Sequence, residues 1–141
     1  MDIRQITPTF YAAPQLTPED VPALLEAGIR LILCNRPDEE VPPGYQASDM
    51  RAAAESAGIR FEEQPLTHYT MTPDIISRNY ALICDCDGPV VAYCASGTRS
   101  TIAWALGSAG DMDAGEIVEA ARSGGYDLSG LRPTLEAASQ R

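Results

Sequence analysis

The sequence predicts an α/β protein with three layers, in which a mostly parallel central sheet lies between two layers of helices. Segments of strand length alternate along the chain with longer segments of helical periodicity, which is typical of a parallel sheet with helical crossovers. Residues 29–34 and 90–93 are almost continuously apolar, and such runs are typical of strands covered on both faces.

The other elements follow from local signals along the chain. Thr17 and Pro18 are typical of a helix start, and Gly58 is typical of a helix end. Residues 59–62 alternate between apolar and polar, as expected for a half-exposed strand. The expected strands are 10–13, 29–34, 59–62 and 90–93, and the expected helices are about 17–28, 48–57, 72–85, 100–109, 113–122 and 131–138.

The segment that carries most chemistry reads Pro-Val-Val-Ala-Tyr-Cys-Ala-Ser-Gly-Thr-Arg-Ser-Thr from residue 89. An apolar strand ends at Cys94, and a helix begins near Ser100. A helix N-terminus presents unpaired N–H groups and partial positive charge, which favour a thiolate or an oxyanion. Arg99 adds a planar fork of donors. We therefore predict Cys94 and Arg99 as catalytic residues, and as anion-binding residues Ala95, Ser96, Gly97, Thr98 and Ser100.

Cys94 on its own also fits a small buried hydrophobe at a strand end. That interpretation explains neither the small residues that follow it nor Arg99. A second strand end, at residue 34, is followed by Asn35 and Arg36. Ligands of parallel sheets bind beyond the carboxyl ends of the strands, so both residues are expected near the Cys94 loop if the two strands are neighbours. Equally, Arg36 fits a solvated rim.

Composition limits the classes of function. The 141 residues, 45% of them hydrophobic, predict one domain over 1–141. The net charge of −10 argues against nucleic acid or an anionic membrane as a partner. No apolar run approaches the ~20 residues of a membrane span, and the N-terminus does not resemble a signal peptide. We therefore expect a cytoplasmic protein whose four cysteines are free thiols.

Cys94-Ala95-Ser96-Gly97-Thr98-Arg99-Ser100 resembles the loop shared by cysteine-based phosphatases and rhodaneses. From Ile6 to Leu131 the chain resembles the phosphatase-like, also sulfurtransferase-like, domain family of β-lactamase hydrolase-like proteins. The resemblance implies a fold like that of dual-specificity phosphatases, with the active loop between the last strand and the next helix. The stretches that carry it are Ile6-Thr7-Pro8, Ala13-Pro14-Gln15-Leu16-Thr17-Pro18-Glu19-Asp20, Asn35-Arg36-Pro37-Asp38, residues 93–100 and Gly125-Tyr126-Asp127-Leu128.

The spacing within the loop indicates which chemistry to expect. Four residues separate Cys94 from Arg99. Tyrosine and dual-specificity phosphatases have one more, whereas rhodaneses that carry the Arg match this shorter loop. His68 stands where those phosphatases place an Asp general acid, and Asp74 is the nearest following Asp. A lone loop histidine is also often simply solvated, and Asp74 fits a first helical turn. Beside that interpretation, His68 is a candidate for the general acid or for a substrate-binding residue, and Asp74 is a weaker candidate for the acid.

These resemblances imply a rhodanese-type sulfurtransferase. Cys94 would form a persulfide and pass its sulfane sulfur to a thiol, without metal or organic cofactor. The partner would be a small sulfur-containing or phosphorylated substrate, with a sulfur-metabolism enzyme as sulfur supplier. One alternative is a tyrosine or dual-specificity-like phosphatase with a phosphocysteine at Cys94, and another is a non-catalytic anion-binding module. The other three cysteines have two interpretations: they are packing residues, or they are redox partners of Cys94. These cysteines are Cys34, Cys84 and Cys86.

Overall fold

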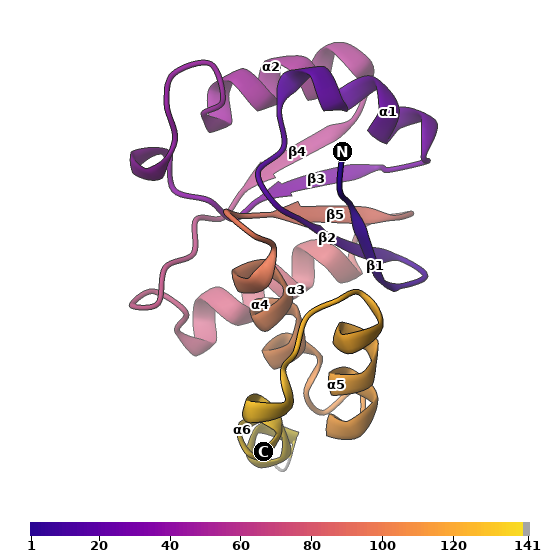
Figure 1. The fold of residues 1–141 in the computed structure, drawn as a ribbon, viewed down its shortest axis with the longest axis vertical. Helices are drawn as coiled ribbons and strands as arrows, with labels where there is room; N and C mark the ends of the chain where they lie inside the picture. The colour runs from indigo at the N-terminus through magenta and orange to yellow at the C-terminus, as the bar shows by residue number, and fades with distance from the viewer. Residues whose placement is uncertain (140–141) are drawn as a thin grey trace.

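The structure is a computed structural model that describes residues 1–139. Five strands form one sheet in the order β1-β2-β5-β3-β4 (Figure 1). β1 runs antiparallel to β2, and all other neighbouring strands are parallel. The predicted mostly parallel sheet is confirmed. The strands are β1 (Arg4–Thr7), β2 (Phe10–Ala13), β3 (Leu31–Cys34), β4 (Arg60–Glu63) and β5 (Val90–Tyr93).

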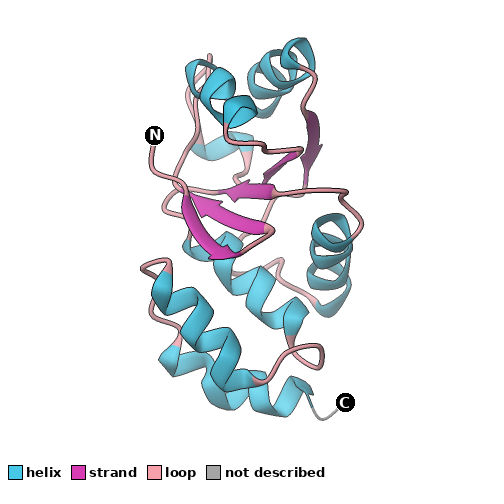
Figure 2. Cartoon of the chain, turned by 90° about the vertical axis from the view of Figure 1, so that its right-hand side faces the viewer, coloured by secondary structure: helices cyan, strands magenta, loops and turns pink. Residues whose placement is uncertain are grey.

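Helices cover both faces of the sheet, and Figure 2 shows the strands between them. α1 and α2 lie on one face, and α3 to α6 lie on the other (Figure 1). Three short 3₁₀ turns complete the structure. The helices are α1 (Val21–Glu26), α2 (Ala47–Ala57), α3 (Pro73–Cys84), α4 (Thr98–Ser108), α5 (Ala114–Ser123) and α6 (Arg132–Ser139), and the turns are η1 (Pro18–Asp20), η2 (Asp38–Glu40) and η3 (Ser129–Leu131).

The central strand β5 separates two hydrophobic cores. Successive side chains of a strand point to opposite faces. Val91 and Tyr93 therefore pack with α1 and α2, whereas Val90 and Ala92 pack with α3 to α6. All four residues are buried, as the continuous apolar run predicts. In the second core the ring of Trp104 stacks on Phe10 with centroids 5.6 Å apart, which fixes α4 against the sheet.

The boundaries of most predicted elements agree with the structure within two residues, and two elements differ more. The strand β1 has no counterpart among the predictions, because its residues are half exposed at the sheet edge and lack a clear period. The expected helix 17–28 is shorter and starts with the turn η1, where the Asp20 carboxylate accepts the N–H of Thr17 at 2.9 Å. Within the described residues 1–139, no helix is both long and apolar enough to span a membrane.

The carboxyl ends of β3 and β5 lie side by side, with Cys34 opposite Tyr93 in the register. The backbone N–H of Asn35 continues the ladder by donating to the carbonyl of Tyr93 at 2.9 Å. The segments that follow the two strands, starting at Asn35 and at Cys94, therefore begin next to each other. The sequence predicts that Asn35 and Arg36 lie near the Cys94 loop if these two strands are neighbours, and the structure meets this condition.

Candidate active site

Cys94 lies at the base of the loop that joins β5 to α4, and it is fully buried. The backbone N–H of Gly97 donates to its Sγ at 3.1 Å. Gly97 precedes α4 with φ of 94°, a left-handed conformation in which a side chain is strained. A Cβ at this position would also overlap the hydroxyl of Tyr126. Glycine is therefore required at this point of the loop.

The first turn of α4 follows this loop directly, with Gly97 as its N-cap residue. The backbone N–H groups of Arg99 and Ser100 belong to this turn, where an α-helix has no intrahelical acceptor for them. Among residues 1–139, neither group donates to a protein acceptor. An anion placed beside Cys94 would find these donors and the positive end of the helix dipole. The arrangement therefore places a buried thiol beside backbone donors without protein acceptors, at the positive end of a helix.

Arg99 is held by three hydrogen bonds from elsewhere in the chain. One Nη donates to the carbonyl of Leu66 at 2.8 Å and to the carboxylate of Glu40 at 2.9 Å, and the other donates to Glu40 at 2.7 Å. The Arg99 side chain is only 14% exposed. The hydrogen bonding between Arg99 and Glu40 lowers the pKa of Glu40 from its ordinary value and raises the pKa of the Arg99 guanidinium. Arg99 is thus a fixed, permanently charged group.

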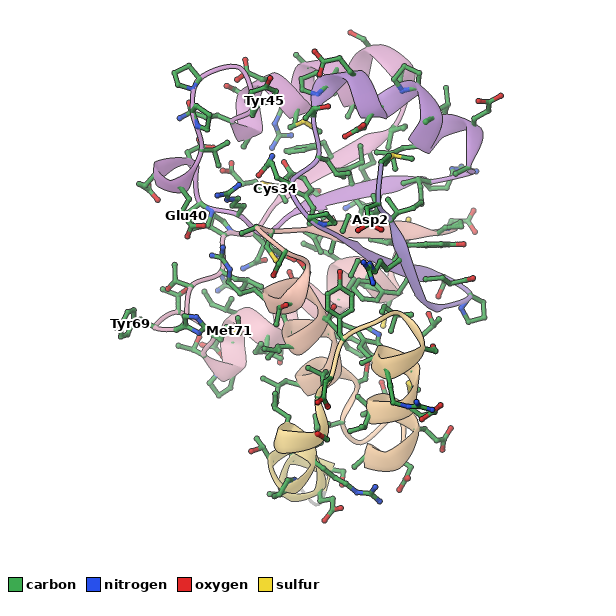
Figure 3. The ribbon with its side chains drawn as sticks, in the orientation of Figure 1. Asp2, Cys34, Glu40, Tyr45, Tyr69 and Met71 are labelled. Carbon is green, nitrogen blue, oxygen red and sulfur yellow. The ribbon has the colours of Figure 1, made fainter. Side chains whose placement is uncertain are left out.

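Glu40 was not among the predicted site residues. It belongs to η2 in the proline-rich loop after β3, 59 positions from Arg99. Figure 3 shows it on the side of the molecule where the strands end. No local pattern distinguishes it from Glu39 beside it. The only usable signal was its position beyond the carboxyl end of a buried strand.

Arg36 reaches the site through Glu40 rather than by contact with the loop. Its Nε donates to the Glu40 carboxylate at 3.3 Å, and one Nη donates to the Glu40 carbonyl at 3.1 Å. The other Nη donates to the side-chain oxygen of Gln15 at 3.1 Å, and the N–H of Gln15 in turn donates to the carbonyl of Ala95 at 3.4 Å. Arg36 therefore joins three segments around the loop.

Asn35 approaches the loop as expected and organises a buried network behind it. The Ser100 hydroxyl donates to Oδ1 of Asn35 at 2.8 Å. The Asn35 amide donates to the carbonyl of Gln64 at 2.9 Å and to Oδ1 of Asn79 at 2.8 Å. The Ser100 hydroxyl thus donates its hydrogen bond to Asn35 and not to the Cys94 sulfur. The side chain of Ser100 anchors the start of α4 to β3 and α3.

The other predicted residues have exposed side chains. The side chains of Ala95, Ser96 and Thr98 are exposed, and the two hydroxyls are 3.0 Å apart. His68 lies in an exposed turn, two positions after the Leu66 carbonyl that binds Arg99. Its neighbour Tyr69 is 95% exposed and projects away from the protein (Figure 3).

The structure separates the other cysteines from Cys94. Cys34 packs with the α1 and α2 core and donates to the carbonyl of Arg36 at 3.4 Å, and burial raises the pKa of its thiol. Cys94 follows Tyr93, so the strand pleat directs it to the opposite face. Cys84 and Cys86 precede β5, at the amino end of a strand about 13 Å long. A disulfide with Cys94 does not fit this geometry.

The fold and the site together define a phosphatase-like α/β domain with a buried cysteine in the loop between its last strand and the following helix. The sequence profile of the phosphatase-like domain of β-lactamase hydrolase-like proteins matches residues 2–111. This chain belongs to that family, as its resemblance to the family predicts.

The curated relatives are longer proteins. The β-lactamase hydrolase-like protein of Agrobacterium fabrum (strain C58) is 30% identical over 119 residues, which are 83% of this chain and 28% of that protein. The protein of the same name from Xylella fastidiosa (strain 9a5c) is 33% identical over 113 residues, 77% of this chain and 26% of that protein. The chain thus spans little more than a quarter of the length of these relatives.

Solved structures support the same class. A crystal structure from Neisseria meningitidis Z2491, provisionally described as a phosphatase, has a TM-score of 0.85 and 32% identity, and covers 98% of this chain and 99% of that chain. PTPMT1 has a TM-score of 0.69 and 18% identity over 98% of this chain and 94% of its own, which shows the fold alone. These similarities support the phosphatase alternative better than the predicted sulfur transfer, which they do not specifically support.

Proposed function

We propose that this chain is a cysteine-dependent phosphatase that hydrolyses phosphate monoesters, with Cys94 as the nucleophile and Arg99 as the clamp for phosphoryl oxygens. The observation that carries the proposal is the geometry of the loop. The Cys94 sulfur accepts the N–H of Gly97 at the positive end of α4, and the same loop holds a charged Arg99 fixed by Glu40. Such preorganised donors stabilise charge that develops during phosphoryl transfer.

The reaction would proceed in two displacements. The Cys94 thiolate attacks phosphorus, an S–P bond forms, and the P–O bond of the ester breaks. The leaving phenoxide takes a proton from water. A water molecule then attacks the phosphocysteine, the S–P bond breaks, and inorganic phosphate, a proton and the thiolate are released. In both steps the equatorial oxygens would accept hydrogen bonds from Arg99 and from the first turn of α4.

The proposed substrate is an aryl phosphate rather than an alkyl phosphate. His68 and Asp74, the two candidates for a general acid, are both exposed. Among residues 1–139, neither side chain makes a hydrogen bond into the Cys94 loop. A leaving group that departs with little help from an acid must be weakly basic, as a phenoxide is and an alkoxide is not.

Sulfur transfer is a second candidate because only four residues separate Cys94 from Arg99. A shorter loop leaves less room for three phosphoryl oxygens but still accommodates one sulfur atom. In this reaction the thiolate attacks the outer sulfur of thiosulfate, the S–S bond of thiosulfate breaks, and sulfite leaves. The persulfide on Cys94 then passes its outer sulfur to an acceptor thiolate.

One experiment separates the two candidates. The reduced protein is incubated with an aryl phosphate and, separately, with thiosulfate, and phosphate release and intact mass are measured. The variants are Cys94→Ala and, as a matched control, Cys84→Ala at an exposed thiol on the opposite edge. We expect phosphate release that Cys94→Ala abolishes and Cys84→Ala retains. A mass gain of one sulfur atom that depends on Cys94, without phosphate release, would overturn the phosphatase proposal.

A further inference from the structure

One peptide unit of the loop connects two hydrogen bonds on opposite sides. The hydroxyl of Tyr126 donates to the carbonyl of Ser96 at 3.1 Å. The N–H of Gly97 donates to Sγ of Cys94 at 3.1 Å. The carbonyl of Ser96 and the N–H of Gly97 belong to the same peptide bond. Because a trans peptide is planar, its C=O and N–H point in opposite directions, so a partner that fixes one also fixes the other.

We propose that Tyr126 is a positioning residue for the nucleophile: by binding the Ser96 carbonyl on the outer side of the loop, it directs the Gly97 N–H onto the Cys94 sulfur. The inference rests on the proposed function in one respect, the use of Cys94 as a nucleophile. It applies equally whether the thiolate attacks phosphorus or sulfur. Tyr126 itself touches no substrate and acts through the loop backbone.

Tyr126 is well placed to hold the peptide in this orientation. It lies in the segment after α5, is 8% exposed, and its N–H donates to the carbonyl of Ala121 at 2.9 Å. The guanidinium of Arg4 lies 5.9 Å from the ring centroid and donates to the carbonyl of Gly124 at 3.3 Å. Burial raises the pKa of the Tyr126 phenol, so the hydroxyl keeps its proton and remains a donor.

The loop sequence fits this arrangement closely. Only a glycine at position 97 adopts the positive φ easily, and only a glycine leaves room for the Tyr126 hydroxyl. The family profile ends at residue 111, so Tyr126 lies outside the matched region. A contact from the C-terminal helical segment therefore completes a site that is otherwise built from the first 100 residues.

The test is the variant Tyr126→Phe, which keeps the ring and removes only the donor. The matched control is Tyr80→Phe, whose hydroxyl donates to Asp111 at 3.0 Å, near the far end of α4. The measurement is the rate of Cys94 alkylation by iodoacetamide against pH, quantified on the Cys94 peptide, with thermal unfolding in parallel. This readout requires no substrate, and a purely structural role would lower the unfolding temperature without slowing the alkylation.

We expect Tyr126→Phe to slow the alkylation of Cys94 about three- to tenfold at neutral pH, because the sulfur loses a well-directed donor. In the same variant, kcat should fall about three- to tenfold while KM changes less. Tyr80→Phe should match the wild type in both readouts.

Two results would contradict these expectations, and they separate a failure of the inference from a failure of the proposed function. An alkylation profile of Tyr126→Phe identical to that of the wild type would overturn the inference and leave the proposed function intact. If Cys94→Ala instead retains the phosphate release and the sulfur transfer of the wild type, Cys94 is not the nucleophile, and the proposed function and the inference both fail.

Discussion

At the scale of single residues, the guanidinium of Arg99 is fixed by protein groups alone. Glu40 binds both of its terminal nitrogens, and the Leu66 carbonyl binds one of them. A rigid, planar group loses little entropy when it binds an oxyanion, whereas a flexible ammonium would have to be ordered first. In the proposed reaction, the geometry of this one side chain determines how well the clamp for phosphoryl oxygens is preorganised.

Arg99→Lys tests this role, because lysine keeps the charge and loses the planar fork. We expect kcat/KM for an aryl phosphate to fall about 100-fold or more, since the donors aimed at the transition state are lost. Steady-state kinetics measure the effect. Arg60→Lys is the control, because Arg60 pairs with Glu62 at 3.1 Å on the exposed face of β4. Equal activity of the two variants would refute the anion-clamp role.

Glu40→Gln tests the ion pair and its pH dependence. Hydrogen bonding to Arg99 lowers the pKa of Glu40 below its ordinary value. The ion pair therefore stabilises the fold fully at a pH above the ordinary pKa of a glutamate. This stabilisation is lost as the pH falls through the lowered pKa of Glu40. Glu40 is about one-third exposed, so we expect a loss below about 1 kcal/mol at neutral pH. Because Arg99 would be less well held, kcat/KM should fall about three- to tenfold.

Urea unfolding at neutral pH and near pH 3 measures the stability difference. The wild type and Glu40→Gln should differ at neutral pH and differ less in acid, because the ion pair loses its effect as the pH falls through the lowered pKa of Glu40. A difference that stays constant between the two pH values would show that the ion pair is not its cause.

At the scale of elements, the site is the junction between β5 and α4. The apolar run of β5 and the buried start of α4 fix the two ends, and Gly97 makes the turn between them possible. The helix start, the strand end and the sharp turn were all predictable, because each has a local sequence signal. The direction of the loop carbonyls was not, because it depends on Tyr126, which lies 30 positions from Ser96.

Gly97→Ala tests the requirement for glycine in the junction. The control is Gly58→Ala, since Gly58 also has a positive φ, 81°, but has no atom within 4 Å of the position of a Cβ. Both variants should lose about 1 kcal/mol of unfolding free energy from backbone strain. Only Gly97→Ala should also lose most of its activity, because its Cβ displaces Tyr126. Unfolding curves and kinetics measure both effects, and full activity in Gly97→Ala would contradict the geometry described.

At the scale of the whole molecule, the charge opposes the proposed substrate. The net charge is −10, so a dianionic ester is repelled at long range and is attracted only near the loop. We expect kcat/KM to rise about two- to threefold between roughly 0.01 and 0.15 M salt, as the Debye length shortens from about 30 to 8 Å. The change should appear in KM and not in kcat. A fall in kcat/KM would show that the positive loop dominates even at a distance.

The molecule as a whole shows why the fold was easier to predict than the site. Interior strands such as β5 are uniformly apolar, and helix starts such as that at Thr72, which caps α3 with its hydroxyl, carry recognisable residues. The edge strand β1 lacks this patterning. Asn35 could be placed because all parallel strands end at the same edge of the sheet. Glu40 and the Leu66 carbonyl could not, because only tertiary contacts bring them to Arg99.

The distribution of thiols over the two edges of the sheet has a practical consequence. Cys84 is exposed at the edge opposite the candidate site, whereas Cys34 and Cys94 are buried. A bulky maleimide should therefore react first at Cys84. Molecules coupled to a sensor chip through that thiol would all stand with the loop facing the solution, and they would form an oriented layer on which weakly binding anions can be screened.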